Sequence, residues 1–311
     1  YLSHWINEFF LALRDHSPRL HHILDLMTLF LASAVRAFGA SRGHAGNLQA
    51  CRRPQKPLEL YDLHGCPYCA KVRNALHYLQ LDHIVYPCPK ESFKQQGACI
   101  NSRFRPKAKS LGGKCVFPML VDPNKLTSAN TDDSVTANSG GGLVMYESSD
   151  IVDYLWREYG HQAQSTWFYR LMNQEPIRSA VARTAAVLRP CLNMGIFRAP
   201  SRQPERHLEF YGADGNPFCT RVQETLATLE LPYIFHVDNT SKAACSKVSC
   251  CSQMPLHEMV KMLGPMFSQP TLKDPNTGVD LKDSAKIVQY LRITYQTAPV
   301  PAEKWTDYLT A

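Results

Sequence analysis

The chain has 311 residues, of which 44% are hydrophobic and 20% charged, and this composition indicates a globular protein long enough for two domains rather than a disordered chain. The net charge of +7 comes from basic residues scattered mostly singly along the chain, so nucleic acid is not expected as a partner. A chain this long and this rich in aliphatic residues does not need disulfides to hold it, so its 11 cysteines predict a reducing compartment with reactive or buried thiols.

The first predicted elements are two helices. Apolar residues at helical spacing predict helices over 5–13 and 20–38, divided by Pro18. The second helix holds the most apolar run of the chain, 26–35, which is well short of the ~20 residues that span a bilayer. We therefore predict that this helix docks on protein, with a position at a membrane surface as the alternative. Residues 1–56 form an N-terminal extension with a basic loop, and because residue 1 is Tyr we expect a processed form or a fragment.

Residues 57–160 predict an α/β domain. An apolar strand at 58–61, a helix from Ala70 and a strand at 84–86 make a βαβ unit. The other expected elements are a helix over 104–111, a strand over 117–121 that begins at a proline, a polar hairpin insertion over 125–142, a returning strand over 143–146, and a helix opened by serine and acidic residues at 147–150.

A Cys-Pro-Tyr-Cys motif, residues 66–69, lies between the first strand and the first helix of this domain. The free N–H groups and positive end of a helix stabilise a thiolate, so Cys66 is the predicted nucleophile and Cys69 the thiol that resolves a mixed disulfide. The alternative is a pair of cysteines kept for packing. His64 either tunes Cys66 or is an ordinary loop residue. A structural zinc site needs a second cysteine pair at suitable spacing, so no metal is expected.

The same pattern recurs at an offset of 150 residues, which indicates an internal duplication. Asn216 stands where Cys66 stands, and an amide cannot act as a thiolate nucleophile. Cys219, at the place of Cys69, is a predicted packed cysteine. At this offset 208–219 matches 58–69; further along the chain 270–276 matches 118–124 and 283–291 matches 147–155, at offsets of 152 and 136 residues. The predicted parts after the first domain are a helical linker over 161–206, a second domain over 207–296 and a tail over 297–311.

The order of these elements and the Cys66–Cys69 motif resemble the thioredoxin-like glutaredoxins. Further motifs resemble plastid proteins with two tandem glutathione S-transferase N-terminal domains, over roughly residues 55–295. These motifs are 86–90, 104–107, 112–114, 117–124, 230–233 and 274–278. The resemblance implies an α/β protein of two tandem thioredoxin-like domains, each preceded by helical segments.

The resemblance also implies a groove for glutathione, used as a cosubstrate, in each domain. In the family, a cis-proline faces the active cysteine, the residue before it offers backbone hydrogen bonds, and an acidic-Ser pair at a helix N-terminus holds the γ-glutamyl group. The residues at these places, with the tyrosine of the motif, are Tyr68, Phe117, Pro118, Glu147 and Ser148 in the first domain, and Gln269, Pro270, Asp283 and Ser284 in the second.

Two functions remain open at the sequence level. One is a plastid thiol-disulfide oxidoreductase, stromal or thylakoid-associated, that uses glutathione or protein thiols to reverse glutathionylation. The other is a non-catalytic subunit of a larger plastid membrane complex, which the 20–38 helix would contact. A full glutathione transferase is not expected, because its all-helical C-terminal domain has no counterpart in the short tail over 297–311. The five cysteines Cys88, Cys99, Cys115, Cys191 and Cys245 are expected to be ordinary thiols.

Overall fold

The structure is a computed structural model of the chain, and its named helices and strands other than helix α2 (Pro18–Ala37) lie in two halves. We call residues 51–161 the first half and residues 198–297 the second half. The residues that the structure describes are 16–37, 51–90, 102–125, 135–137, 142–161, 174, 177, 180, 181, 184, 198–237 and 270–297.

The first half is built on a five-stranded sheet. β1 (Leu58–Asp62) runs parallel to β2 (His83–Pro87), and α4 (Pro67–Tyr78) is the crossover that this pairing requires. On its other side β1 pairs antiparallel with β3, which pairs with β5, which pairs with β4. These three strands are β3 (Met119–Asp122), β4 (Val135–Ala137) and β5 (Leu143–Met145).

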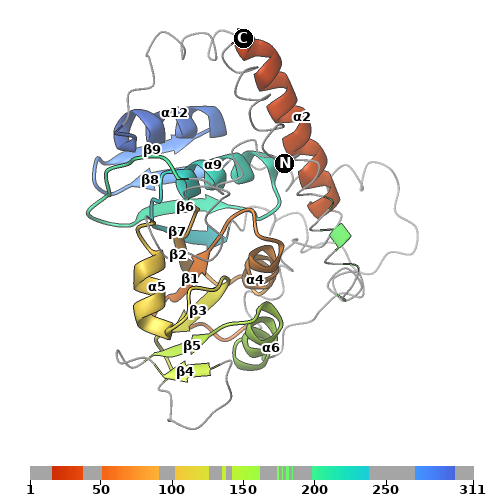
Figure 1. The fold of residues 1–311 in the computed structure, drawn as a ribbon, viewed down its shortest axis with the longest axis vertical. Helices are drawn as coiled ribbons and strands as arrows, with labels where there is room; N and C mark the ends of the chain where they lie inside the picture. The colour runs from red at the N-terminus through yellow and green to blue at the C-terminus, as the bar shows by residue number, and fades with distance from the viewer. Residues whose placement is uncertain are drawn as a thin grey trace.

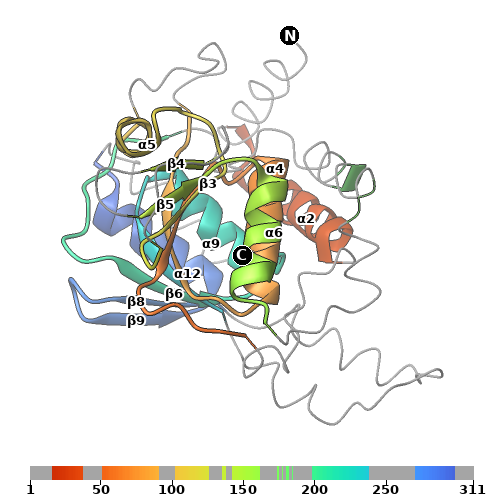
Figure 2. The ribbon, with the colours of Figure 1, turned by 90° about the horizontal axis from the view of Figure 1, so that it is seen from below.

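Helices cover both faces of this sheet (Figures 1 and 2). α4 and α6 (Ser148–Glu158) pack against one face, where apolar side chains of β1 and of the two helices form a buried core. α5 (Arg105–Gly112) lies against the other face, over a second core that includes the stacked rings of Tyr61 and Tyr86. Since alternate residues of a strand point to opposite faces, β1 contributes to both cores.

The second half repeats the strand pairing of the first. β6 runs parallel to β7 and antiparallel to β8, and β8 pairs with β9. α9 and α12 pack on one another and on the same core. The bounds are β6 (Leu208–Gly212), α9 (Pro217–Thr228), β7 (Tyr233–Val237), β8 (Thr271–Asp274), β9 (Val279–Lys282) and α12 (Ser284–Tyr295).

A matching polar cluster stands at the same place in each half. In the first half the hydroxyls of Tyr154 and Tyr159 donate to the carboxylate of Asp122, which is fully buried. In the second, the hydroxyls of Tyr290 and Tyr295 donate to Asp274. A buried carboxylate must be hydrogen-bonded to be tolerated, so both halves solve the same problem with the same residue types.

The two halves join through β2 and β7, which pair antiparallel and complete one nine-stranded sheet. At the centre of this joint Ile84 lies opposite Ile234, and these two residues are separated by the offset of 150 that relates the halves in sequence. A pairing centred on equivalent residues is the isologous arrangement of a two-fold symmetric contact. Val85, from the first half, belongs to the core of the second half, so the joint is apolar as well as hydrogen-bonded.

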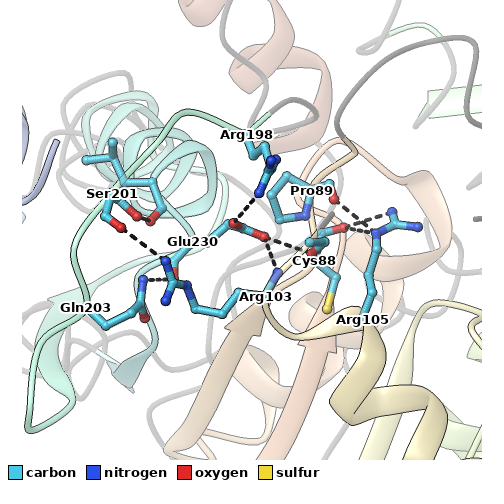
Figure 3. Close-up of polar contacts among 10 residues, drawn as sticks. Cys88, Pro89, Arg103, Arg105, Arg198, Ser201, Gln203 and Glu230 are labelled. Atoms are coloured by element: carbon cyan, nitrogen blue, oxygen red, sulfur yellow. Dashed lines mark hydrogen bonds and ion pairs between the residues drawn. The ribbon is translucent and has the colours of Figure 1, made fainter. Parts of the chain in front are cut away.

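A loop of the first half is also held by the second half, through the buried carboxylate of Glu230 (Figure 3). Its Oε1 accepts hydrogen bonds from the Ser102 hydroxyl and the Arg103 N–H, both at 2.8 Å. Shortly after, the Arg105 side chain donates to the carbonyl groups of Cys88 and Pro89. These hydrogen bonds connect the segment that leads into α5 to Glu230 of the second half and to Cys88 and Pro89 of the first.

Helix α2 (Pro18–Ala37) lies against α9 of the second half (Figure 1). Leu29 and Ala32 are buried, and the Phe30 ring meets the edge of Phe218 with centroids 5.6 Å apart. Other large apolar side chains of α2 remain exposed: Leu20, Ile23, Met27 and Leu31. Among the helices described, none has the length and apolar character needed to cross a membrane.

Several expected boundaries need correction. α4 begins at Pro67, not at Ala70, because proline fits the first helical position, so Cys69 lies inside the helix. The stretch 125–142 is expected to be an insertion in a hairpin loop, but it contains β4. This strand pairs antiparallel with β5 and forms an edge of the sheet. The helix expected over 5–13 lies outside the described residues, and of the linker over 161–206 only its two ends and isolated positions are described.

Candidate functional site

Cys66 occupies the N-cap position of α4 in an extended backbone conformation, directly before Pro67. Its sulfur faces the thiol of Cys69 and the free N–H groups of Tyr68 and Cys69 at the start of the helix. Hydrogen bonding from the Cys69 thiol, helped by these backbone groups and opposed by burial, lowers the pKa of Cys66 to about 7. A substantial fraction of Cys66 is therefore thiolate at neutral pH.

Cys69 has the opposite character. It is fully buried in the first turn of α4, and burial together with the hydrogen bond to Cys66 raises the pKa of its thiol well above the ordinary value. The pair is thus divided into an ionised sulfur at the helix end and a protonated donor behind it. This is the division expected of a nucleophile and a resolving thiol.

A buried ion pair lies behind the two cysteines. Nη1 of Arg73 lies 2.6 and 2.7 Å from the two carboxylate oxygens of Asp62, and Nη2 donates to the carbonyl of His64. Asp62 is hydrogen-bonded to Cys69, and burial raises the pKa of its carboxyl group. His64 therefore holds Arg73 through its backbone, which is a structural role for a residue that the sequence placed beside the motif.

The Phe117–Pro118 peptide bond is cis. It immediately precedes β3, whose first residue, Met119, lies opposite Tyr61 near the end of β1. Because Cys66 follows β1 by a few residues, this register brings Pro118 and the Cys66 motif to the same edge of the sheet. The guanidinium of Arg105, the first residue of α5, lies 5.0 Å from the centroid of the Phe117 ring. This cation–π contact connects α5 to the residue that precedes the cis bond.

The N-terminus of α6 reaches that edge as well, since Met145 at the end of β5 lies opposite Leu120 of β3. Glu147 is the N-cap residue, but with φ of 60° it makes no side-chain cap, contrary to the capping expected there. The first N–H groups of α6 therefore receive nothing from that side chain, which leaves them suited to an anion. Nζ of Lys71 donates to Oγ of Ser149 at 2.6 Å and links α4 to α6.

In the second half, Asn216 replaces the nucleophile with a helix cap. Its Oδ1 accepts hydrogen bonds from the N–H groups of Phe218 and Cys219, at 2.9 and 3.2 Å, and the residue is only 2% exposed. These are the positions of the groups that face the sulfur of Cys66 in the first half. The amide therefore satisfies α9 without a thiolate, and the site is closed to solvent.

Cys219 is fully buried and packs against Gly212, where a Cβ atom would come within 2.8 Å of its sulfur. Gly212 stands where the first half has Asp62, so the second half has no room for that carboxylate. Of the binding residues expected in this half, Pro270 and Ser284 are buried. Asp283 caps α12 by accepting from the N–H groups of Ala285 and Lys286, and Gln269 lies outside the described residues.

The remaining described cysteines divide into buried thiols and one disulfide. Cys51, Cys88 and Cys219 are free and buried, so among the described free cysteines only Cys66 reaches the surface. Cys115 is disulfide-bonded, which corrects the expectation that it is an ordinary thiol. Within the described part of the chain, no group of three or more His, Cys, Asp and Glu side chains is arranged to hold a metal ion.

The sequence interpretation missed the buried charges Asp62 and Arg73. A signal was present, because Asp62 directly follows the strand predicted over 58–61 and Arg73 lies among the apolar residues Val72, Ala75 and Leu76 of the predicted helix. Their counterparts in the second copy, Gly212 and Gln223, carry no charge. Charges that are lost together with a nucleophile point to a shared role near it.

The comparisons with known proteins match one part of the chain to a family model. Residues 60–163 match the family model described as glutathione S-transferase, N-terminal domain. A solved structure, "Leishmania TDR1 - a unique trimeric glutathione transferase", has 16% sequence identity and a TM-score of 0.23, with 80% of this chain and 72% of that chain covered. No curated protein sequence matches.

The match over 60–163 includes the cysteine motif, the cis-proline and α6. The chain therefore has a mixed α/β fold with a thioredoxin-type domain like that of glutathione S-transferases, and this likeness suggests a function related to glutathione.

Proposed function

We propose that the protein is a glutathione-dependent thiol-disulfide oxidoreductase that removes glutathione from mixed disulfides. The observation that carries this proposal is the division of labour in α4, where Cys66 is partly ionised at neutral pH and Cys69 is a buried, protonated thiol. The cis bond before Pro118 and the N-terminus of α6 lie at the same edge of the sheet. Together they offer backbone groups and a positive helix end to a peptide carrying carboxylates.

In the first step the Cys66 thiolate attacks the glutathione sulfur of a protein mixed disulfide. A bond forms between Cys66 and that sulfur, the original disulfide breaks, and the protein thiolate leaves and takes a proton from water. Phe117 would hold the cysteinyl part of glutathione through its backbone, and Ser148 with Glu147 would hold the γ-glutamyl end. Tyr68 is 53% exposed and would lie over the bound peptide.

In the second step Cys69 attacks Cys66 and releases glutathione. Asp62, which is hydrogen-bonded to Cys69, accepts the thiol proton, and its raised pKa suits it to this task. The Cys66–Cys69 disulfide that results is oxidised by two electrons. Two glutathione molecules then reduce it and are themselves oxidised to glutathione disulfide.

We further propose that the two halves are tandem thioredoxin-like domains, of which the second has lost its chemistry. The repeated strand pairing, the paired Asp-Tyr clusters and the joint centred on Ile84 and Ile234 support this interpretation. The expected domain limits, 57–160 and 207–296, enclose the two repeats. A plastid location rests on the resemblance alone and is proposed on that basis.

The test is the reduction of a glutathionylated peptide by the purified full chain with glutathione present. Cys66→Ser should abolish turnover. Cys69→Ser, mixed with the glutathionylated peptide in the absence of free glutathione, should keep the first step and accumulate a mixed disulfide at Cys66, visible as added mass. Cys219→Ser is the matched control, because it changes the equivalent buried cysteine of the second half and should leave the rate unchanged. Equal rates for the wild type and Cys66→Ser would refute the proposal.

A second candidate is a non-catalytic subunit of a larger plastid complex. Two observations favour it: Asn216 closes the second site, and α2 keeps exposed apolar residues on the side away from α9. Native size analysis of plastid extracts separates the two candidates. Migration of the protein as a free monomer would exclude the subunit role. Migration of the Cys66→Ser variant in a large assembly would favour it, because assembly would then not depend on the nucleophile.

A further inference from the structure

The guanidinium of Arg73 lies between two carboxylates that come from different halves of the chain. Beyond its bonds to Asp62, its Nε lies 3.7 Å from Oδ1 of Asp214, in the loop between β6 and α9. The side chains of Arg73 and Asp214 are 4% and 11% exposed, so water screens their interaction little. Nε has no hydrogen bond with the described residues, and Asp214 is the charge that faces it.

The position of Asp214 is fixed by its surroundings. Its backbone N–H faces Nδ1 of His77 on α4 at 3.4 Å, across the boundary between the halves. Two residues later Asn216 caps α9, which packs on α12 and against β2. The loop thus presents its carboxylate from a rigid frame.

We propose that Asp214 is a positioning residue for the Cys66–Cys69 pair. Asp214 belongs to the half without a nucleophile, and its carboxylate partly neutralises the positive charge of Arg73 near the cysteine pair. The proposal rests on the proposed function, because it takes the two cysteines to be a redox pair. Asp214 acts through Arg73 and Asp62 and touches neither the substrate nor the reacting sulfurs.

The arrangement works in one direction only. In the second half, Gly212 and Gln223 stand at the places of Asp62 and Arg73, so no ion pair forms between these two positions. In the first half, His64 stands at the place of Asp214, and its carbonyl also binds Arg73. The duplicated loop therefore supplies the first half with a charge that the first copy of that loop does not carry.

The sign of the effect follows from the charges around Arg73. Its neighbours that can carry negative charge are Asp62, Asp214, Cys69 and Tyr233, with the imidazole of His77 beside Asp214. A cation favours thiolates, and a second carboxylate offsets part of that cation. Removing the charge of Asp214 leaves Arg73 balanced by Asp62 alone, so Arg73 attracts negative charge more strongly at Cys69 and, through the hydrogen bond of Cys69, at the Cys66 thiolate. This stabilises the reduced pair.

The experiment compares the full chain with three variants: Asp214→Asn, Asp214→Glu and Asp280→Asn. Each protein is equilibrated with dithiothreitol, which passes two electrons and two protons to the Cys66–Cys69 disulfide and becomes a cyclic disulfide. Asp214→Asn should raise the equilibrium constant for reduction three- to tenfold, where tenfold corresponds to about 30 mV. It should also move the midpoint of Cys66 alkylation to lower pH.

Asp214→Glu restores the charge and should behave like the wild type, and Asp280→Asn removes an exposed charge of the same half and should change nothing. The proposal is overturned if Asp214→Asn matches the wild type in both measurements, or if Asp214→Glu shifts them as far as Asp214→Asn does. A purely structural role for Asp214 would change stability without moving the redox equilibrium.

Two further outcomes are separable. If Asp214→Asn does not fold, the double variant Asp214→Asn/Arg73→Gln is compared with Arg73→Gln alone. The charge that Asp214 offsets is absent from both proteins, so the pH midpoint of Cys66 alkylation should be the same in the two. A difference between them contradicts the proposal. If the wild-type cysteines form no disulfide, the proposed oxidoreductase function fails, whereas the alkylation midpoint still decides the role of Asp214.

Discussion

At the scale of single residues, Cys66 and Cys69 form a pair in which one sulfur is partly ionised at neutral pH and the other is a buried, protonated thiol. The ionisation of Cys66 follows first from the hydrogen bond that Cys69 donates and then from its place at the start of α4. The sequence predicts the cysteine pair and a helix close behind it. The ion pair of Arg73 with Asp62 depends on a helix and a strand meeting in three dimensions, and the contact with Asp214 depends on the second half as well. Local patterns carry no information on such long-range contacts.

We predict that alkylation of Cys66 by iodoacetamide rises with pH with a midpoint near 7, the value to which its surroundings lower the pKa. An ordinary thiol has its midpoint near ~8.5. The first cause of the shift is the hydrogen bond from Cys69, so Cys69→Ala should move the midpoint upward. Rates are followed by mass spectrometry of the peptide that contains Cys66. An unchanged midpoint in Cys69→Ala would show that the helix end alone sets the pKa.

At the scale of elements, the two halves use the same helix positions in different ways. Asp283 caps α12 with its side chain, whereas Glu147, the equivalent residue before α6, does not cap. Asn216 caps α9, whereas Cys66 leaves the N-terminus of α4 to its sulfur. In each pair the half that carries the Cys66–Cys69 motif has no side-chain cap, so the helix ends in the first half remain available for ligands.

This difference predicts unequal costs for the same substitution. Asp283→Ala should lower the free energy of unfolding by about 1 kcal/mol, because the N–H groups of Ala285 and Lys286 lose their acceptor. Glu147→Ala removes no cap and should cost clearly less, which makes it the matched control. Urea denaturation followed by circular dichroism measures both. Equal losses would mean that the side chain of Asp283 contributes no capping energy.

At the scale of the whole molecule, the sequence predicts two similar units, but it does not predict that their strands join in one nine-stranded sheet. The repeat at 150 residues gives two units, and the pattern of each unit places β2 and β7 at an edge. Their apolar residues suit strands that are covered, and an exposed apolar edge strand is a liability that proteins avoid. The sequence does not identify the strand that covers this edge, because the edge strand of any sheet can form the same backbone hydrogen bonds. The choice depends on how the side chains of the two units fit together.

The joint between the halves buries a histidine, which makes the stability of the whole molecule depend on pH. His83 begins β2, donates from Nδ1 to the carbonyl of Leu81 at 2.9 Å, and lies beside the Phe235 ring across the joint. Burial lowers its pKa to about 4. Charged groups near it are Asp82, which pairs with His236 of the second half, and Asp214.

The sign of the pH effect follows from the lowered pKa. In the unfolded chain His83 takes up a proton near its ordinary pKa of ~6.5, whereas in the folded chain it stays neutral until about pH 4. Its contribution is therefore complete above pH ~6.5 and is lost as the pH falls towards 4, by about 3 kcal/mol at most. Urea denaturation between pH 7 and 4 should show this loss.

His83→Gln, which cannot ionise but can still donate to Leu81, should lose less stability over the same pH range than the wild type. The exposed His161, changed to Gln, is the control and should follow the wild-type curve. Parallel curves for the wild type and His83→Gln would show that this histidine is not the group responsible. A smaller loss of unfolding free energy in His83→Gln would show that the sensitivity of the fold to acid arises where β2 pairs with β7. These are the two strands through which the sheet continues from the cysteine-bearing half to the second half.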